Sequence, residues 1–194
     1  MTTFLSWLGK LWLRLSGWKI VGDPLPADHY VFAAAFHTSN WDFLICMATR
    51  SSVKSPVCWI GKQQLFYWPL GPFMRLLGGV PVNRNKNTDM VGQIVAEFKK
   101  HKRFGVAIFP EGTRKKVSRW KTGFYQIAMQ AGVPIQPTCL DYKTKTFYLG
   151  PLFYPSGDYQ RDMEFLKPFW RIGTPKYPEK ADMDFETNYS PPRR

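Results

Sequence analysis

The sequence predicts an α/β protein, built as a single domain with a mixed, mostly parallel central sheet and helices on both faces. Short apolar runs that end in turn residues alternate along the chain with stretches of helical period. The 194 residues suit one domain with a proper core, and hydrophobic residues make up 44% of them. No internal repeat and no second domain are visible in the sequence.

Residues 1–19 are predicted to form an amphipathic helix that lies in a membrane interface. Apolar side chains share one face at helical spacing, whereas Lys10 and Arg14 lie off that face. Tryptophan and leucine opposite cations are typical of interfacial helices. An ordinary amphipathic helix packed on its own domain is the competing interpretation. The apolar stripe consists of Phe4, Leu8, Leu11, Leu15 and Trp18, widened by Leu5, Trp7 and Trp12.

The domain proper is expected at residues 20–173. Buried apolar runs predict strands at 30–36, 56–61, 78–84, 104–110, 133–140 and 145–153. Amphipathic or apolar helical period predicts helices at 40–50, 63–77, 88–102, 122–132 and 159–172, the second of them interrupted by Pro69, Gly71 and Pro72. Thr88 or Asp89 can cap the third of these helices, and Gly132 ends the fourth. Residues 174–194 are rich in proline and charge, which predicts a loose tail.

The charge and the cysteines restrict the class of protein. Lysine and arginine number 27 against 14 acids, a formal charge of +13 that attracts nucleic acid, anionic lipid headgroups or phosphorylated substrates. Cys46, Cys58 and Cys139 are an odd number without paired spacing, so we interpret them as reduced thiols in a protein that faces the cytosol. His29 and His101 have no ligand-like neighbours, so no metal site is expected. The chain has no uninterrupted run of about 18 apolar residues, so no membrane-spanning helix is expected either.

His37 follows the apolar run at 30–36, at the point where a strand gives way to a helix. In α/β sheets, active sites gather beyond the carboxyl ends of strands. His37 and Asp42 would not share a helix face, because a step of five residues turns by about 140°. His37 must therefore lie in the preceding loop or first turn if Asp42 is to hold one ring nitrogen and leave the other as a base. A histidine hydrogen-bonded to an aspartate for purely structural reasons is the alternative.

No protein nucleophile accompanies this pair. Ser39 lies close by, but its position before the helix suits a cap. A base without a nucleophile indicates that the substrate supplies its own hydroxyl.

A second motif, "IFPEGTR" at residues 108–114, runs from a strand into a turn. Gly112 permits a tight turn with exposed N–H groups, and Arg114 offers a bidentate fork for phosphate. Lys115, Lys116 and Arg119 add positive potential. A plain turn with solvated cations is the alternative interpretation.

At this point the chain resembles the glycerolipid acyltransferases, the group that contains 1-acylglycerol-3-phosphate acyltransferase. "HTSNWD" at 37–42 matches the H-x4-D box of the family, and "FPEGTR" at 109–114 matches its E-G-T-R box. Residues 61–84 resemble the intermediate block, and "VPIQP" at 133–137 resembles the final apolar-proline block. The four blocks occur in the family's order over roughly residues 30–140.

The resemblance implies an O-acyltransferase of phospholipid biosynthesis, without metal or cofactor. His37, oriented by Asp42, would take the proton from the hydroxyl of a lysophospholipid, which attacks the thioester of acyl-CoA or acyl-carrier protein. The protein is expected to attach peripherally to the cytoplasmic face of a membrane that contains anionic lipid. In a bacterium this would be the inner membrane. The resemblance assigns substrate binding to Lys62, Arg84, Glu111, Gly112, Thr113 and Arg114.

One departure from the family pattern leaves the acceptor open. Gln64 stands where many members carry glutamate in the intermediate block, so another lysolipid, including an amino-acid lipid, is an alternative acceptor. A hydrolase of thioesters or lipids is a second alternative. A nucleic-acid-binding module is a third, but no known binding motif is present and the cations are scattered.

Overall fold

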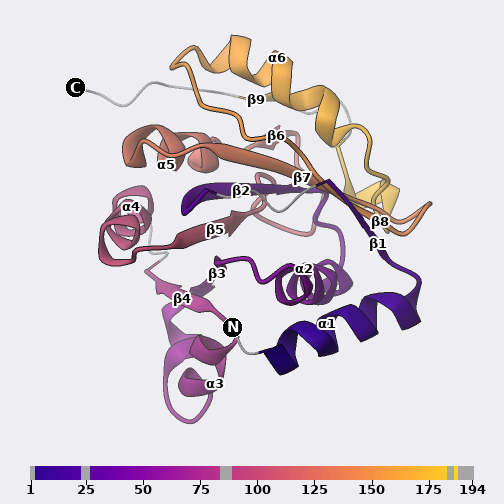
Figure 1. The fold of residues 1–194 in the computed structure, drawn as a ribbon. Helices are drawn as coiled ribbons and strands as arrows, with labels where there is room; N and C mark the ends of the chain where they lie inside the picture. The colour runs from indigo at the N-terminus through magenta and orange to yellow at the C-terminus, as the bar shows by residue number, and fades with distance from the viewer. Residues whose placement is uncertain (1–2, 23–26, 84–88, 183–185, 188–194) are drawn as a thin grey trace.

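The computed structural model describes residues 3–22, 27–83, 89–182 and 186–187, and it confirms the predicted α/β architecture (Figure 1). Seven strands form a sheet in which only the pair β7 and β8 is antiparallel among the described strands. All other neighbouring strands of this sheet are parallel. The sheet is therefore mixed and mostly parallel. In spatial order its strands are β1 (Lys19–Val21), β8 (Thr146–Leu149), β7 (Ile135–Asp141), β2 (His29–Ala35), β5 (Phe104–Ile108), β3 (Val57–Lys62) and β4 (Gly79–Val82).

Helices cover both faces of this sheet (Figure 1). One face packs against α4 (Met90–Lys100), α5 (Gly123–Ala131) and α6 (Tyr159–Trp170), which contribute residues such as Ile94, Phe124 and Leu166 to the larger buried cluster. The opposite face packs against α2 (Asn40–Ser52), with α1 (Thr3–Ser16) beside it, around Ile45 and Leu13. β2 and its neighbours β5 and β7 are therefore buried between two layers, which explains their continuous apolar runs.

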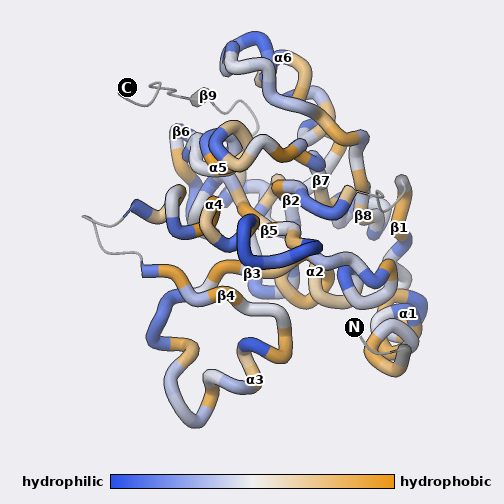
Figure 2. The backbone as a smooth tube through the Cα atoms, turned by 60° about the vertical axis from the view of Figure 1, so that its left-hand side comes forward, coloured by the Kyte–Doolittle hydropathy of each residue, from blue (hydrophilic) through white to orange (hydrophobic). Residues whose placement is uncertain are grey.

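The helix predicted at 63–77 is two short helices instead. A 3-10 turn, η1 (Gln63–Phe66), is followed by α3 (Gly71–Leu76). Pro69 lies in the break, and proline lacks an N–H and disfavours helical geometry in the residue before it. Pro72 lies in the first turn of α3, where proline is tolerated. This segment projects from the sheet beyond β4 (Figures 1 and 2).

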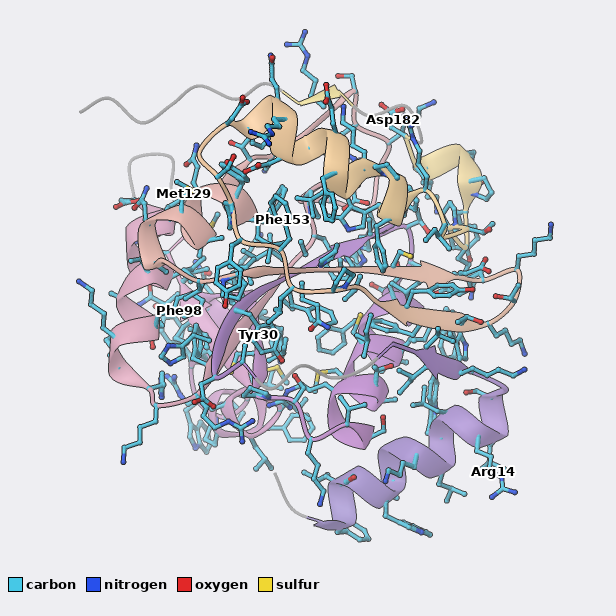
Figure 3. All side chains as sticks on the ribbon, turned by 45° about the horizontal axis from the view of Figure 1, so that its top comes forward. Arg14, Tyr30, Phe98, Met129, Phe153 and Asp182 are labelled. Carbon is cyan, nitrogen blue, oxygen red and sulfur yellow. The ribbon has the colours of Figure 1, made fainter. Side chains whose placement is uncertain are left out.

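The small residues of α1 pack against α2, whereas most of its apolar stripe is exposed. Gly9 lies so close to α2 that a Cβ there would come within 2.7 Å of the Ala48 carbonyl oxygen, and Ser6 donates a hydrogen bond to the Ser52 carbonyl. Hydrophobic residues nevertheless recur along α1 (Figure 2), and six of them are exposed. Figure 3 shows Arg14 pointing outward from the helix. The exposed residues are Phe4, Leu5, Trp7, Leu8, Leu11 and Leu15.

Two predictions about the ends of the chain are wrong in part. Trp18 does not belong to the exposed stripe, because α1 ends at Ser16 and Trp18 is buried in the core. Within the predicted loose tail, residues 174–182 pack on the domain, with Ala181 buried and the short helix η2 (Pro178–Lys180) formed. Further on, β9 (Glu186–Thr187) pairs in parallel with β6 (Arg119–Trp120). Strands of two or three residues, which include β1, carry too little periodicity to be predicted.

Candidate active site

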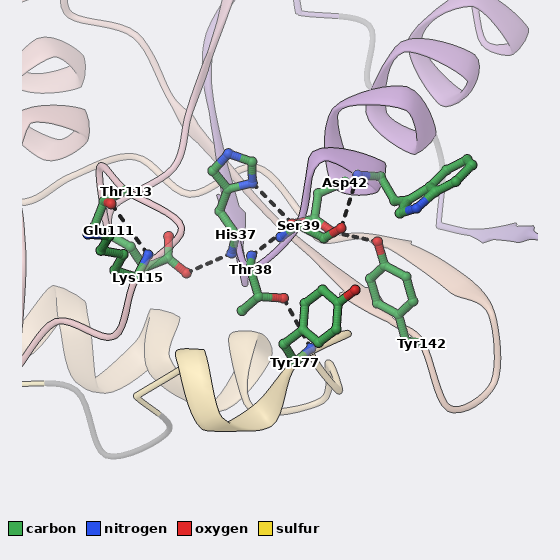
Figure 4. A network of polar contacts seen from close by, with 10 residues as sticks. His37, Thr38, Ser39, Asp42, Glu111, Thr113, Lys115, Tyr142 and Tyr177 are labelled. Atoms are coloured by element: carbon green, nitrogen blue, oxygen red, sulfur yellow. Dashed lines mark hydrogen bonds and ion pairs between the residues drawn. The ribbon is translucent and has the colours of Figure 1, made fainter.

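His37 and Asp42 meet at the carboxyl end of β2, in the middle of the sheet. His37 follows the strand and precedes the first residue of α2, so it lies in the loop, as the spacing requires. Its Nδ1 is 3.1 Å from Oδ2 of Asp42, which is fully buried (Figure 4). The predicted pairing of the two side chains is therefore present.

The carboxylate of Asp42 also builds the start of α2. Ser39 is the N-cap and Asp42 is the third residue of α2, and the two form a capping box in which each side chain accepts a hydrogen bond from the other's backbone N–H. Oδ2 of Asp42 accepts from the N–H groups of Thr38 and Ser39, both at 2.8 Å. The Ser39 hydroxyl accepts from the Trp41 N–H, so it is engaged as a cap and not as a nucleophile.

The turn after β5 lies against the other side of His37. β2 and β5 are parallel neighbours, so both strands end at the same edge of the sheet. Phe109 stacks on the imidazole, with ring centroids 4.1 Å apart and planes within 19°. The His37 backbone N–H donates to Oε1 of Glu111 at 3.1 Å (Figure 4). Glu111 therefore fixes the backbone of His37, a role that its place in the E-G-T-R box did not indicate.

Glu111 is buried, and burial raises the pKa of its carboxyl group to about 7. Backbone N–H bonds from Glu111 itself and from His37 act in the opposite direction, and the charge of Asp42 adds to the rise. Oε2 has no hydrogen-bond partner among the described residues. Glu111 is thus close to half protonated at neutral pH.

Replacing Glu111 with glutamine is expected to remove a pH dependence of stability. The pKa of Glu111 is about 7 in the folded protein, whereas a carboxyl group of the unfolded chain has a pKa near 4.5. The free energy of unfolding of the wild type therefore falls as the pH rises between these values. The loss amounts to about 3 kcal/mol. Urea unfolding at pH 4.5 and pH 8 should show this fall in the wild type and a smaller one in E111Q. An equal fall in the free energy of unfolding in both proteins would contradict this prediction.

A tight turn carries the E-G-T-R box into the cavity wall. Gly112 has φ of 65°, in the left-handed region that favours glycine, and its N–H donates to the Phe109 carbonyl. A Cβ at this position would also lie 3.0 Å from the Lys121 side chain. The Lys121 N–H in turn donates to the Pro110 carbonyl, which ties the Lys121 backbone to this turn.

A cavity of about 810 Å³ opens beside the histidine. Lys62, Arg114 and Lys121 are exposed cations on its wall, together with Gly112 and Thr113. The remaining lining is largely apolar and comes from α2, β3, β5 and the turn after β5, and it includes Phe43, Met47, Val57, Trp59, Ala107 and Phe109. The cavity thus joins a cationic region, a histidine and an apolar wall, a combination that suits an amphiphile with an anionic headgroup.

The structure brings most of the predicted site residues together. Among the predicted residues that line the cavity are His37, Lys62, Gly112, Thr113 and Arg114, whereas Asp42 and Glu111 lie behind it and hold His37. Arg84 lies outside the described residues. Two residues of the site were not predicted from the sequence. They are Lys121, which lines the cavity, and Tyr142, whose hydroxyl donates to Oδ1 of Asp42. Neither lies in a sequence motif that gave a distinctive signal.

Fold and site together define a class: a mostly parallel α/β domain with a histidine–aspartate pair facing an apolar cavity lined in part by cations. A family model described as Acyltransferase matches residues 18–141. This chain belongs to that acyltransferase family. Its resemblance to the glycerolipid branch is supported by its relatives.

Two of those relatives and one solved structure of the same fold show how far the similarity extends. The 1-acyl-sn-glycerol-3-phosphate acyltransferase of Escherichia coli is 34% identical over 78% of this chain and 64% of its own length. The protein of the same name from Salmonella typhimurium is 33% identical over 72% of this chain and 59% of its own length. The crystal structure of the 1-acyl-sn-glycerophosphate acyltransferase PlsC from Thermotoga maritima superposes with a TM-score of 0.57 at 20% identity, covering 84% of this chain and 76% of that one. The chain therefore spans about three fifths of the length of these curated relatives.

Proposed function

We propose that this protein transfers a fatty acyl group from acyl-CoA or acyl-carrier protein to the hydroxyl of a lysophospholipid such as 1-acylglycerol-3-phosphate. The observation that carries the proposal is the His37–Asp42 pair beside a cavity that is apolar along most of its wall and cationic at Lys62, Arg114 and Lys121. The names of the curated relatives support the same reaction.

The chemistry follows from the tautomer that Asp42 selects. With Nδ1–H donated to the carboxylate, Nε2 is the ring nitrogen left to act as a base. It removes the proton from the acceptor hydroxyl as the oxygen attacks the thioester carbonyl carbon. The carbon–sulfur bond then breaks, and the imidazolium returns the proton to the leaving thiolate. The products are the acylated lipid and a free thiol, with no acyl-enzyme.

The side chains around His37 support direct transfer. Ser39 is engaged in capping α2. Cys46, one helical turn beyond Asp42, is held as a thiol because burial and the nearby carboxylate raise its pKa. Neither group is suited to form a covalent intermediate, since the thiolate is the reactive form of cysteine.

The test is to incubate the purified full chain with labelled acyl-CoA, or labelled acyl-carrier protein, and a series of lysolipids. Acylated lipid without matching release of free fatty acid is the expected result. Release of fatty acid alone would favour the alternative hydrolase and would overturn the proposal. The series also identifies the acceptor, because lysophosphatidic acid and an amino-acid lysolipid differ in their anionic headgroup.

We further propose that α1 holds the protein on the surface of a membrane. No helix in the described part of the chain has the length and hydropathy to span a bilayer. The exposed apolar stripe of α1 is flanked by the exposed cations Lys10 and Arg14, which suits insertion at an interface that contains anionic lipid. Such attachment is peripheral, on the cytoplasmic face of the inner membrane in a bacterium.

Placing glutamate at Trp7 and Leu15 together is expected to weaken vesicle binding about a hundredfold. Each substitution forfeits roughly 1.5 kcal/mol of apolar burial in the bilayer. Sedimentation with vesicles of phosphatidylethanolamine and phosphatidylglycerol measures the change. Phe165 and Ile172 are also exposed, at the other face of the sheet, so F165E/I172E is the matched control and should bind like the wild type. Equal loss in both double variants would remove α1 as the attachment site.

A further inference from the structure

Tyr142 completes the hydrogen bonding of Asp42 from a distant part of the chain. It follows the last residue of β7, one hundred positions beyond Asp42, and its hydroxyl donates to Oδ1 (Figure 4). Oδ2 already accepts from the His37 imidazole and from the N–H groups of Thr38 and Ser39. Both oxygens are thereby engaged, and the carboxylate cannot rotate without breaking bonds at both.

The phenol is itself held in place. Its ring lies edge-on to Trp18, with centroids 5.1 Å apart, and the Tyr142 backbone N–H donates to the Thr174 carbonyl at 2.9 Å. The ammonium of Lys176 lies 5.1 Å from the Trp41 ring centroid and 5.8 Å from that of Tyr142. Burial and the adjacent Asp42 raise the pKa of Tyr142, so its hydroxyl keeps the proton that it donates.

We infer that Tyr142 is a positioning residue for the histidine–aspartate base: its hydroxyl fixes the Asp42 carboxylate and moderates the negative charge that faces the imidazole. This inference rests on the proposed function, because its effect is measured in acyl transfer. A charge-assisted hydrogen bond of this kind fixes geometry and also withdraws charge from the acceptor. Tyr142 makes no contact with the reacting atoms in this role.

Removal of the hydroxyl has a defined electrostatic sign. In Y142F, Oδ1 loses its donor, and more negative charge remains on the carboxylate. The protonated imidazole is then favoured, so a higher pH is needed to obtain the neutral base. The acid limb of the pH–rate profile is therefore expected to move to higher pH.

The chain offers a matched control in Tyr125. Its hydroxyl donates to Oδ2 of Asp162 at 2.7 Å, and the same carboxylate oxygen accepts a backbone N–H from Ser156. Tyr125 is fully buried in the cluster beneath α5 and α6, and it is not among the residues that line the cavity. Y125F thus removes a buried phenol–carboxylate bond of the same type without touching the base.

The experiment compares steady-state transfer by wild type, Y142F and Y125F from pH 5 to pH 9, below the melting temperature of each. For Y142F, kcat is expected to fall on the order of ten- to a hundredfold, by analogy with the hydrogen-bond partners that orient metal-binding side chains, with KM unchanged and the acid limb moved to higher pH. Y125F should keep the wild-type kcat and profile. If Y142F matches Y125F in both, the inference fails; if the wild type transfers no acyl group, the proposed function fails instead.

Two further variants keep the inference falsifiable. Asp42→Asn removes the group through which Tyr142 acts, so adding Y142F to D42N should lower kcat less than threefold; a full additional loss would overturn the inference. 3-Fluorotyrosine at position 142 keeps the hydroxyl and the shape and is therefore expected to fold even where phenylalanine does not. Its stronger donor should move the acid limb to lower pH, and a shift in the same direction as Y142F would contradict the assigned role.

Discussion

Replacing His37 with alanine is expected to lower kcat for acyl transfer by roughly 10²- to 10⁴-fold, the usual contribution of a general base. The loss follows because the variant lacks Nε2, the ring nitrogen that accepts the proton of the acceptor hydroxyl. Capping of α2 should persist, since Asp42 still accepts from the Thr38 and Ser39 N–H groups. Initial rates with labelled acyl donor, together with a thermal melt, test both statements.

His101 provides the control for this substitution. It is an exposed histidine at the end of α4, paired with Glu97, and it is not among the residues that line the cavity. H101A should therefore retain the wild-type rate. If H37A keeps more than a tenth of wild-type kcat while folded, the imidazole is not the base, and water or a substrate group must remove the proton.

Replacing Asp42 with asparagine is expected to lower kcat by about 10⁴-fold, comparable to the loss when the carboxylate of a catalytic triad becomes an amide. The amide oxygen of the new side chain can still accept from the Thr38 and Ser39 N–H groups. The same oxygen faces Nδ1, because all three contacts fall on Oδ2, but a neutral amide cannot stabilise the imidazolium that forms when His37 takes the proton. Steady-state kinetics on D42N should show the loss in kcat with little change in KM.

Stability separates the two duties of Asp42. D42A removes the cap as well as the imidazole partner and is expected to unfold about 1 kcal/mol more easily than D42N. Asp158 caps α6 by accepting from the Arg161 N–H, far from the cavity, so D158N is the control for a cap change without catalytic effect. If D42N retains activity within tenfold, orientation by the carboxylate is not required.

The parts of the site that were predictable come from short chain segments. His37 and Asp42 are five positions apart across a strand–helix junction, so local geometry allows them to meet once His37 lies in the loop. The turn at Gly112 was equally readable, because a glycine after an apolar run marks a strand end. The order of helices and strands followed from periodicity for the same reason.

The parts that could not be predicted depend on contacts between distant segments. Tyr142 reaches Asp42 only because β7 lies beside β2 in the sheet, and strand order is not encoded in local pattern. Nothing in the sequence distinguishes Lys121 from the other cations. Its place on the cavity wall is visible only in the structure, where its side chain lies beside Gly112. The role of Glu111 toward the His37 backbone likewise depends on the adjacent ends of β2 and β5.

The tail shows how composition can mislead. Residues 174–182 lack helical or strand period, yet Tyr177 donates its N–H to the Thr38 hydroxyl, and Ala181 is buried. Irregular backbone can pack closely where side chains and carbonyl groups satisfy its hydrogen bonds. Low periodicity therefore indicates that a segment has little regular secondary structure. It does not indicate that the segment lacks contacts with the domain.

The capping box at the start of α2 gives a single carboxylate to both helix initiation and imidazole orientation. Fraying of the first turn of this helix would thus inactivate a molecule whose sheet is still intact. Amide hydrogens of Thr38 and Ser39, both bonded to that carboxylate, would exchange with solvent only in such transiently opened molecules. Their protection factors would report the fraction of competent protein, and heat inactivation would precede global melting.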